Sequence, residues 1–293
     1  MCGIVGYIGK KNTKEILLDG LKELEYRGYD SAGIAILEDG NFTSYKAVGK
    51  LVNLEEKTKE FETKGFAVGI GHTRWATHGK PTELNAHPHL GEFSYVVHNG
   101  IIENYVKLKK ELMDNGVTFL SQTDTEVIVH QFERNFRALS NEFEAFKKTI
   151  SELEGAFAIL LVTKSSPDTI YFAKQGSPMM VGVSSEGEKY FASSDTPLIG
   201  HCSEAAYFDD GDFGFVSANE IALFNKHGNK KKPTFTKLSA NRLSAQKNGY
   251  RFFMEKEIYE QSSVIADTLM GRLGENEVIF EEITPSLLDG INE

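Results

Sequence analysis

Short apolar runs, rich in β-branched and aromatic residues, recur along most of the chain. Runs of this kind, bounded by polar or glycine-containing segments, predict β-strands. The first begins directly after the second residue of the chain and covers residues 3–8. The other predicted strands are residues 32–37, 42–48, 66–70, 93–98, 156–162, 169–173, 180–183, 190–192, 213–216 and 221–224.

Apolar positions at helical spacing predict a smaller set of helices. Thr13 is expected to be the N-cap of the first helix, because apolar residues follow it at intervals of three and four. The pair Thr123 and Glu126 has the spacing of a capping box and predicts a second helix start. Further helices are expected over residues 101–115, 124–137, 142–153 and 254–273.

The order of these elements predicts the fold class and the domain boundary. Strand runs, then helix runs, then more strands joined by short turns favour an α+β fold with largely antiparallel sheets. Near residue 240 the chain becomes polar and turn-rich. We therefore expect one domain over residues 1–240. Residues 241–293 are interpreted as a linker, a helix and the opening of a further domain that this chain does not contain.

Composition narrows the classes of partner. The 293 residues include 40% hydrophobic and 25% charged residues and carry a formal net charge of −10. This acidic balance disfavours nucleic acid and anionic membranes as partners. No run reaches the ~18 apolar residues that a membrane span needs, and no secretory leader is recognisable. We expect a cytoplasmic protein whose two cysteines, Cys2 and Cys202, stay reduced.

Cys2 is the first candidate for catalysis. If Met1 is removed, this residue carries both a thiol and a free α-amine, so one residue supplies a nucleophile and a base that can deprotonate it. The alternative interpretation, an inert small residue after the initiator, stays open at this point.

A second candidate is the polar segment 71–81, followed by residues 85–89. It combines Arg74, the lone Trp75, two threonines and several histidines, which is typical of a binding loop rather than of a core or a linker. A metal site is disfavoured because no Cys or carboxylate lies at a familiar ligand spacing. Nucleotide-binding loops are disfavoured too, since the third glycine of a dinucleotide motif and the Ser or Thr of a P-loop are absent.

Two further positions allow either a structural or a chemical interpretation. Asn99 and Gly100 follow an apolar run, where an amide and a backbone N–H can form an oxyanion hole or simply a turn. Asp124 stands at the start of a predicted helix, so it can complement the helix dipole or hold an ammonium group.

Taken together, six motifs resemble the N-terminal-nucleophile glutamine amidotransferases. The resemblance covers nearly the whole chain and extends most closely to the glucosamine-6-phosphate synthase family, to which the segment MEKEIYEQ at 254–261 is also similar. It implies a four-layer αββα sandwich of two antiparallel sheets. The motifs are CGIVG at 2–6, RGYDSAG at 27–33, HTRWATHG at 72–79, HNGIIEN at 98–104, TDTE at 123–126 and GSP at 176–178.

The resemblance also implies roles. Cys2 would attack the carboxamide of glutamine with its α-amine as base, and Asn99 with Gly100 would hold the oxyanion. Arg74 would bind the α-carboxylate of glutamine, and Asp124 its α-ammonium. The remaining residues implied at the substrate site are Thr77, His78, Trp75 and Arg27, with Trp75 in a loop that closes over the site and Arg27 beside the nucleophile.

No cofactor or metal is implied. Family members pass ammonia to a sugar-phosphate isomerase domain that converts fructose 6-phosphate into glucosamine 6-phosphate, so we expect this chain to be the glutaminase part of a longer, homodimeric protein. Alternatives remain: hydrolysis of another amide, the glutaminase domain of a different amidotransferase, or a sugar-sensing module in which Cys2 is incidental.

Overall fold

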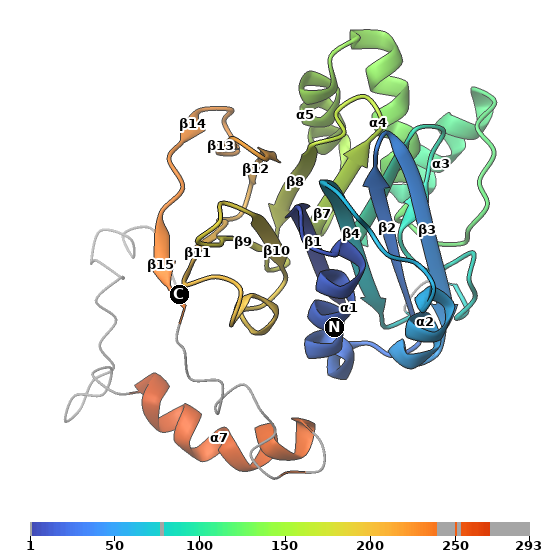
Figure 1. The fold of residues 1–293 in the computed structure, drawn as a ribbon. Helices are drawn as coiled ribbons and strands as arrows, with labels where there is room; N and C mark the ends of the chain where they lie inside the picture. The colour runs from blue at the N-terminus through green and yellow to red at the C-terminus, as the bar shows by residue number, and fades with distance from the viewer. Residues whose placement is uncertain (1, 77–78, 239–249, 251–252, 270–293) are drawn as a thin grey trace, which may run out of the picture. The chain divides into compact units, whose positions relative to one another are not determined.

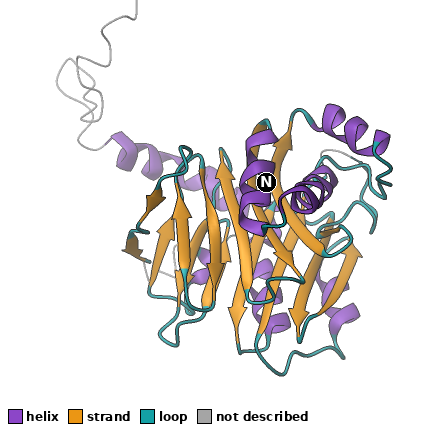
Figure 2. Ribbon diagram, turned by 90° about the horizontal axis from the view of Figure 1, so that it is seen from above, coloured by secondary structure: helices purple, strands orange, loops and turns teal. Residues whose placement is uncertain are grey.

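The computed structural model describes residues 2–76, 79–238, 250 and 253–269. The chain divides into two units, Met1–Ala240 and Asn241–Glu293. The domains expected from the sequence, and the functions assigned to them, stay predictions. The described strands all belong to the first unit, which is rich in strands (Figures 1 and 2).

Within the described residues, two antiparallel sheets form the centre of the first unit. Strand β1 (Gly3–Gly9) lies in the middle of the first sheet, paired with β4 (Ala67–Arg74) on one side and β10 (Lys189–Ala192) on the other. The rest of this sheet consists of β2 (Ser31–Glu38), β3 (Asn41–Val48), β9 (Met180–Val183), β11 (Glu204–Tyr207) and β15 (Phe235–Lys237).

The second sheet has β7 (Gly155–Thr163) near its centre, paired along its length with β6 (Ser94–Ile102). Side chains such as Leu160, Phe172 and Phe191 are fully or almost fully buried in a core to which both sheets contribute. The other strands of this sheet are β5 (His89–Leu90), β8 (Thr169–Gln175), β12 (Asp212–Ser217), β13 (Ile221–Phe224) and β14 (Lys230–Lys231).

Helices cover the outer face of each sheet, as two further apolar clusters indicate. Helices α1 (Thr13–Leu24) and α2 (Leu51–Thr58) pack on the first sheet. Helices α3 (Tyr105–Asp114), α4 (Glu126–Leu139) and α5 (Glu142–Glu152) pack on the second (Figure 1). The predicted four-layer αββα arrangement of the α+β class is confirmed. Short 3-10 turns occur at Glu25–Arg27 and Thr196–Leu198.

Several local predictions were wrong, and each for a tertiary reason. Residues 71–74 are the end of β4 rather than part of a loop, because β1 and β2 pair with them on both sides. Strand β6 does not end before Asn99 but continues to Ile102, paired with β7, so the next helix starts only at Tyr105.

The predicted helix caps were also wrong. The N-cap of α1 is Asn12, and Thr13 is its first residue. The N-cap of α4 is Thr125, without a side-chain cap. Glu126 does not close a capping box with Thr123, since its carboxylate accepts hydrogen bonds from Leu120 N–H and Ser121 N–H instead.

In the second unit, helix α7 (Phe253–Leu269) confirms most of the helix expected over 254–273, and residues 270–273 lie outside the described part. None of the described helices is long and apolar enough to cross a membrane.

Candidate active site

Cys2 lies at the start of β1, where the pairing of Gly3 with Thr73 brings it beside the end of β4. Its Sγ accepts a hydrogen bond from Trp75 N–H at 3.2 Å. Burial raises the pKa of the Cys2 thiol, although the Trp75 N–H and the positive charge of Arg74 act in the opposite direction. The thiol is therefore mostly protonated near neutral pH, and it needs a base to become a nucleophile.

A narrow cavity of about 30 Å³ opens at Cys2. Both sheets and the segment before α4 contribute to its walls. Cysteine, arginine and carboxylate side chains are thus brought to one place from distant parts of the sequence. The lining residues are Cys2, His72, Arg74, Trp75, His87, His98, Gly100, Thr123, Asp124 and Thr125.

Arg74 ends strand β4 and is only 4% exposed. Its guanidinium donates to the carbonyl of Gly79 at 3.2 Å and to that of Lys80 at 3.5 Å, which ties it to the following segment. Burial lowers the pKa of Arg74, while the neighbouring Asp30 and Asp124 act in the opposite direction. An arginine remains cationic in such a setting, so it offers the cavity a fixed positive charge.

Asp124 supplies the opposite charge. One oxygen of its carboxylate, Oδ2, accepts a hydrogen bond from Ile102 N–H at 2.8 Å, which fixes the side chain to the end of β6. Only 6% of this residue is exposed. The cavity therefore carries a cation and an anion at separate points, an arrangement that suits a zwitterionic ligand such as a free amino acid.

Asn99 and Gly100 come from β6 of the second sheet. The Asn99 amide donates from Nδ2 to the carbonyl of Cys2 at 3.0 Å, so it lies directly beside the candidate nucleophile. Gly100 has φ +132°, and a Cβ at this position would lie 1.9 Å from the carbonyl oxygen of Ala156. Only glycine fits here, because both the backbone conformation and the space exclude a side chain.

The segment after β4 is anchored to the first sheet. Ala76 N–H donates to Asp30 Oδ2 at 2.7 Å, and Asp30 N–H donates to the carbonyl of Arg74 at 3.0 Å. Trp75 is 44% exposed, and its ring packs edge-on against that of Tyr29 with centroids 5.7 Å apart. Thr77 and His78, which the sequence also assigns to the site, lie outside the described residues.

Arg27 does not line the cavity. Its guanidinium donates to the hydroxyl of Tyr26 at 3.0 Å and to the carbonyl of Ser193 at 3.5 Å. Ser193 in turn accepts a hydrogen bond from Ile4 N–H at 3.1 Å, so Arg27 lies near the strand that carries the nucleophile. A role beside Cys2 stays a prediction.

The cavity wall contains three buried histidines, His72, His87 and His98, to which the sequence assigned no individual role. His72 and His87 counted only among the histidines of the predicted binding loop. Burial lowers the pKa of all three below the ordinary value, so their rings are neutral near pH 7. The alternation of side chains along β4 could have indicated that one of them, His72, is buried. Val68 and Ile70 face the inter-sheet core, and His72 continues the same face.

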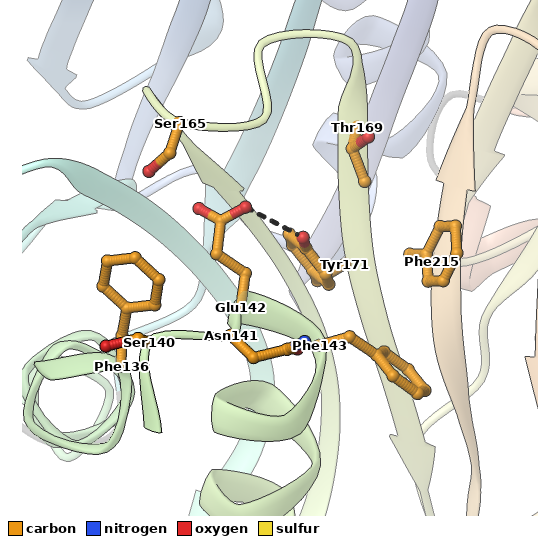
Figure 3. A pocket seen from close by; sticks show the side chains of 9 residues that line it. All are labelled: Phe136, Ser140, Asn141, Glu142, Phe143, Ser165, Thr169, Tyr171 and Phe215. Atoms are coloured by element: carbon orange, nitrogen blue, oxygen red, sulfur yellow. Dashed lines mark hydrogen bonds between the residues drawn. The ribbon is translucent and has the colours of Figure 1, made fainter. Parts of the chain in front are cut away.

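A wider cavity of about 370 Å³ lies elsewhere in the first unit (Figure 3). Its only acidic lining residue, Glu142, points toward Tyr171, and its carboxylate accepts hydrogen bonds from Thr163, Ser166 and Tyr171. Its described lining contains no cysteine or histidine, whereas the smaller cavity contains both.

Comparisons with known proteins identify what the chain as a whole is similar to. A family described as "Glutamine amidotransferase domain" matches residues 74–200. A glutamine–fructose-6-phosphate aminotransferase [isomerizing] from Campylobacter jejuni is 55% identical over 100% of this chain and 49% of its own length. One of the same name from Helicobacter pylori is 45% identical over 100% of this chain and 48% of its own length. The chain spans about half the length of the curated relatives it matches.

A solved structure gives the same result for the fold. The glutamine phosphoribosylpyrophosphate amidotransferase from B. subtilis, complexed with ADP and GMP, matches 82% of this chain and 50% of its own with a TM-score of 0.60 and 26% identity. Sequence and fold therefore agree that this chain contains a glutamine amidotransferase domain.

Proposed function

We propose that this chain hydrolyses glutamine to glutamate and ammonia through a thioester on Cys2. The observation that carries the proposal is the cavity in which Cys2, Arg74 and Asp124 meet. A thiol nucleophile with a cation and an anion around it suits a substrate that has an amide at one end and a free amino acid group at the other.

In the proposed reaction, the α-amine of Cys2, freed by removal of Met1, takes the thiol proton. The thiolate attacks the carboxamide carbon of glutamine, and the tetrahedral intermediate collapses with loss of ammonia, to which the amine returns the proton. Water then attacks the glutamyl thioester, and glutamate leaves with the thiol restored. The raised pKa of Cys2 is consistent with a need for this base.

The remaining roles follow the same chemistry. The Asn99 side-chain amide and the Gly100 N–H would stabilise the oxyanion, an interaction worth about 3–4 kcal/mol per donor in other enzymes. Arg74 would bind the α-carboxylate and Asp124 the α-ammonium. Trp75, with Thr77 and His78, would belong to the segment that closes over bound glutamine. Arg27 is proposed only to support the strand of the nucleophile.

In the intact protein, the ammonia would serve a second reaction. The names of the relatives point to fructose 6-phosphate as acceptor. We propose glucosamine 6-phosphate as the product of the whole enzyme. Because the chain covers about half of these relatives, we propose that a sugar-phosphate isomerase part lies in the other half and that the full protein is a cytoplasmic homodimer. No acceptor site is proposed for residues 1–240.

The test is glutamate release from glutamine by the purified chain, with intact mass used to establish whether Met1 is present. Release by Met1-free protein that disappears in Cys2→Ala would support the proposal. Cys202→Ala is the matched control, since that thiol lies outside the cavity and burial raises its pKa to about 12. Equal release by the parent and Cys2→Ala would rule out Cys2 as nucleophile.

A further inference from the structure

The Asn99 amide is hydrogen-bonded on both sides, and the second partner is a histidine from the opposite sheet. Its Oδ1 lies 2.9 Å from His72 Nε2, while its Nδ2 donates to the carbonyl of Cys2. We infer that His72 is a positioning residue, which holds the Asn99 amide in the one orientation that presents its N–H groups to the reacting carbonyl. This inference rests on the proposed function.

The protonation of His72 follows from its partners. Nε2 lies 2.9 Å from the Asn99 amide oxygen and 3.1 Å from the carbonyl oxygen of His98. A carbonyl oxygen can only accept, so the His98 contact requires Nε2 to carry the hydrogen. Burial lowers the pKa of His72 to about 3, which leaves Nδ1 without a proton in the neutral ring. The neutral ring therefore has one tautomer, in which Nε2 carries the hydrogen and donates it.

This donor determines which way the amide faces. If the Asn99 amide rotated by a half-turn, its NH₂ group would face the Nε2–H of His72, and its oxygen would face the carbonyl of Cys2. Both contacts would then be repulsive, whereas the observed orientation satisfies both. One N–H of Nδ2 binds Cys2, which leaves the other to serve an oxyanion beside Sγ.

The histidine ring is itself held firmly. His72 is 1% exposed, and its ring stacks on that of His87 with centroids 4.0 Å apart and planes inclined by 19°. Strands β1 and β2 pair with its backbone on both sides, opposite Ile4 and Gly33. Since Asn99 belongs to the second sheet, this contact joins the two sheets beside the nucleophile.

The test uses three substitutions in Met1-free chain. His72→Leu removes the donor, His72→Gln can place an amide N–H near the Nε2 position, and His72→Asn is too short to reach it. We expect kcat for glutamine hydrolysis to fall about 100-fold in His72→Leu and in His72→Asn but to stay within about tenfold of the parent in His72→Gln. KM should change by about threefold or less. His227→Leu, at an exposed turn, is the control.

Action through Asn99 is separated from a general structural role by a double-mutant cycle. In an Asn99→Ala background, His72→Leu should lower kcat by about threefold or less, because its target is gone. A loss that is equally large in both backgrounds would overturn the inference. Alkylation of Cys2 by iodoacetamide, which needs no oxyanion hole, should proceed at the same rate in all variants, and a parallel loss of alkylation would also contradict it.

A measurement that does not depend on catalysis distinguishes a failure of this inference from a failure of the proposed function. The side-chain NH₂ resonances of Asn99, assigned by their loss in Asn99→Ala, should shift and exchange faster with solvent in His72→Leu than in His72→Gln. If the parent released no glutamate, the proposed function would fail while this comparison still decided the orientation. Unchanged Asn99 resonances in folded His72→Leu and His72→Asn would show that His72 does not position the amide.

Discussion

At the scale of single residues, the cavity is defined by charges that are each fixed by the backbone. Asp124 accepts Ile102 N–H, and Arg74 donates to two carbonyls of the segment after β4. These hydrogen bonds hold both charges at the cavity, where they can act as recognition points for a ligand. The proposed recognition of glutamine depends on this placement as much as on the charges.

Replacing Asp124 by Asn tests the charge without removing the side chain. The amide oxygen can still accept Ile102 N–H, but the negative charge for the substrate ammonium is lost. A hydrogen bond to a charged group is worth about 1.5–3 kcal/mol, so we expect kcat/KM for glutamine to fall roughly 10- to 100-fold. Steady-state glutamate release measures the change.

The matched control for this variant is Asp19→Asn on the exposed face of α1, which removes the same charge away from the cavity. Its kcat/KM should equal that of the parent. If Asp124→Asn and Asp19→Asn gave the same kcat/KM, Asp124 would have no part in binding the ammonium.

At the scale of elements, strand β6 combines two requirements in consecutive residues. Asn99 must reach Cys2, and Gly100 must pass close to Ala156 on β7. The pairing of β6 with β7 continues through both residues, so the unusual φ of Gly100 lies inside a sheet. Backbone strain of this kind is tolerated only where the surrounding structure enforces it.

Gly100→Ala is therefore expected to destabilise the fold strongly. The new Cβ would meet a backbone oxygen at 1.9 Å, and φ would remain positive, so the loss in free energy of unfolding should exceed about 3 kcal/mol. Urea denaturation followed by circular dichroism gives the value.

Gly116→Ala separates the cost of the positive φ from the cost of the close contact with Ala156. This residue also has positive φ, at +86°, but its Cβ would meet nothing within 4 Å. Only the conformational cost of about 1–2 kcal/mol should remain. Equal losses in the two variants would mean that the contact with Ala156 is relieved and that strain alone matters.

The start of helix α4 depends on Glu126. Burial alone would raise the pKa of its carboxyl group, but hydrogen bonds from His130, Leu120 N–H and Ser121 outweigh that effect and lower the pKa to about 2. The ordinary pKa of about 4.3 applies in the unfolded chain. A depressed pKa stabilises the fold above the unfolded value and loses this contribution as the pH falls from about 4.3 toward 2.

Glu126→Gln should remove this pH dependence. At pH 7 we expect a loss of about 2 kcal/mol in free energy of unfolding, and a difference from the parent that shrinks as the pH approaches 2. Denaturant titrations at several pH values measure it. The exposed Glu83 serves as control through Glu83→Gln, and a difference between Glu126→Gln and the parent that is constant with pH would contradict the assignment.

At the scale of the whole molecule, the described members of the three apolar clusters lie in the first unit. Within that unit they form a core between the sheets and a helix-covered face on each sheet. This distribution makes the first unit a candidate for independent folding and for independent glutaminase activity.

A chain ending at Ala240 tests that expectation. Its Tm should lie within about 4 °C of that of the longer chain, and its kcat for glutamate release should agree within about twofold, because the described residues of the apolar clusters and of the cavity lie in the first unit. Thermal unfolding and the glutaminase assay are run side by side. Loss of activity with Tm unchanged would show that the removed residues support the site, and loss of both would place the domain boundary elsewhere.

Local pattern was sufficient for much of the fold. Strands such as β2, β7 and β12 were predicted within a residue or two of their ends, because alternating or continuous apolar runs report burial directly. The family resemblance assigned the candidate site to Cys2, Arg74, Asn99, Gly100 and Asp124, which the structure brings to one place. Strand positions and family motifs can be predicted in this way because each is encoded by residues adjacent in the sequence.

Only the tertiary structure decided which distant segments of the chain are in contact. His72 had no assigned role in the sequence, since its role depends on Asn99, a residue of the opposite sheet. The sequence predicted a loop at residues 71–74 and a helix start at the end of β6. Both segments are strand in the structure, because they pair with neighbouring strands. The sequence by itself determined which residues are apolar, reactive or charged. The packing of two sheets determined which of them meet, because hydrogen bonds across a core join positions that no local pattern relates.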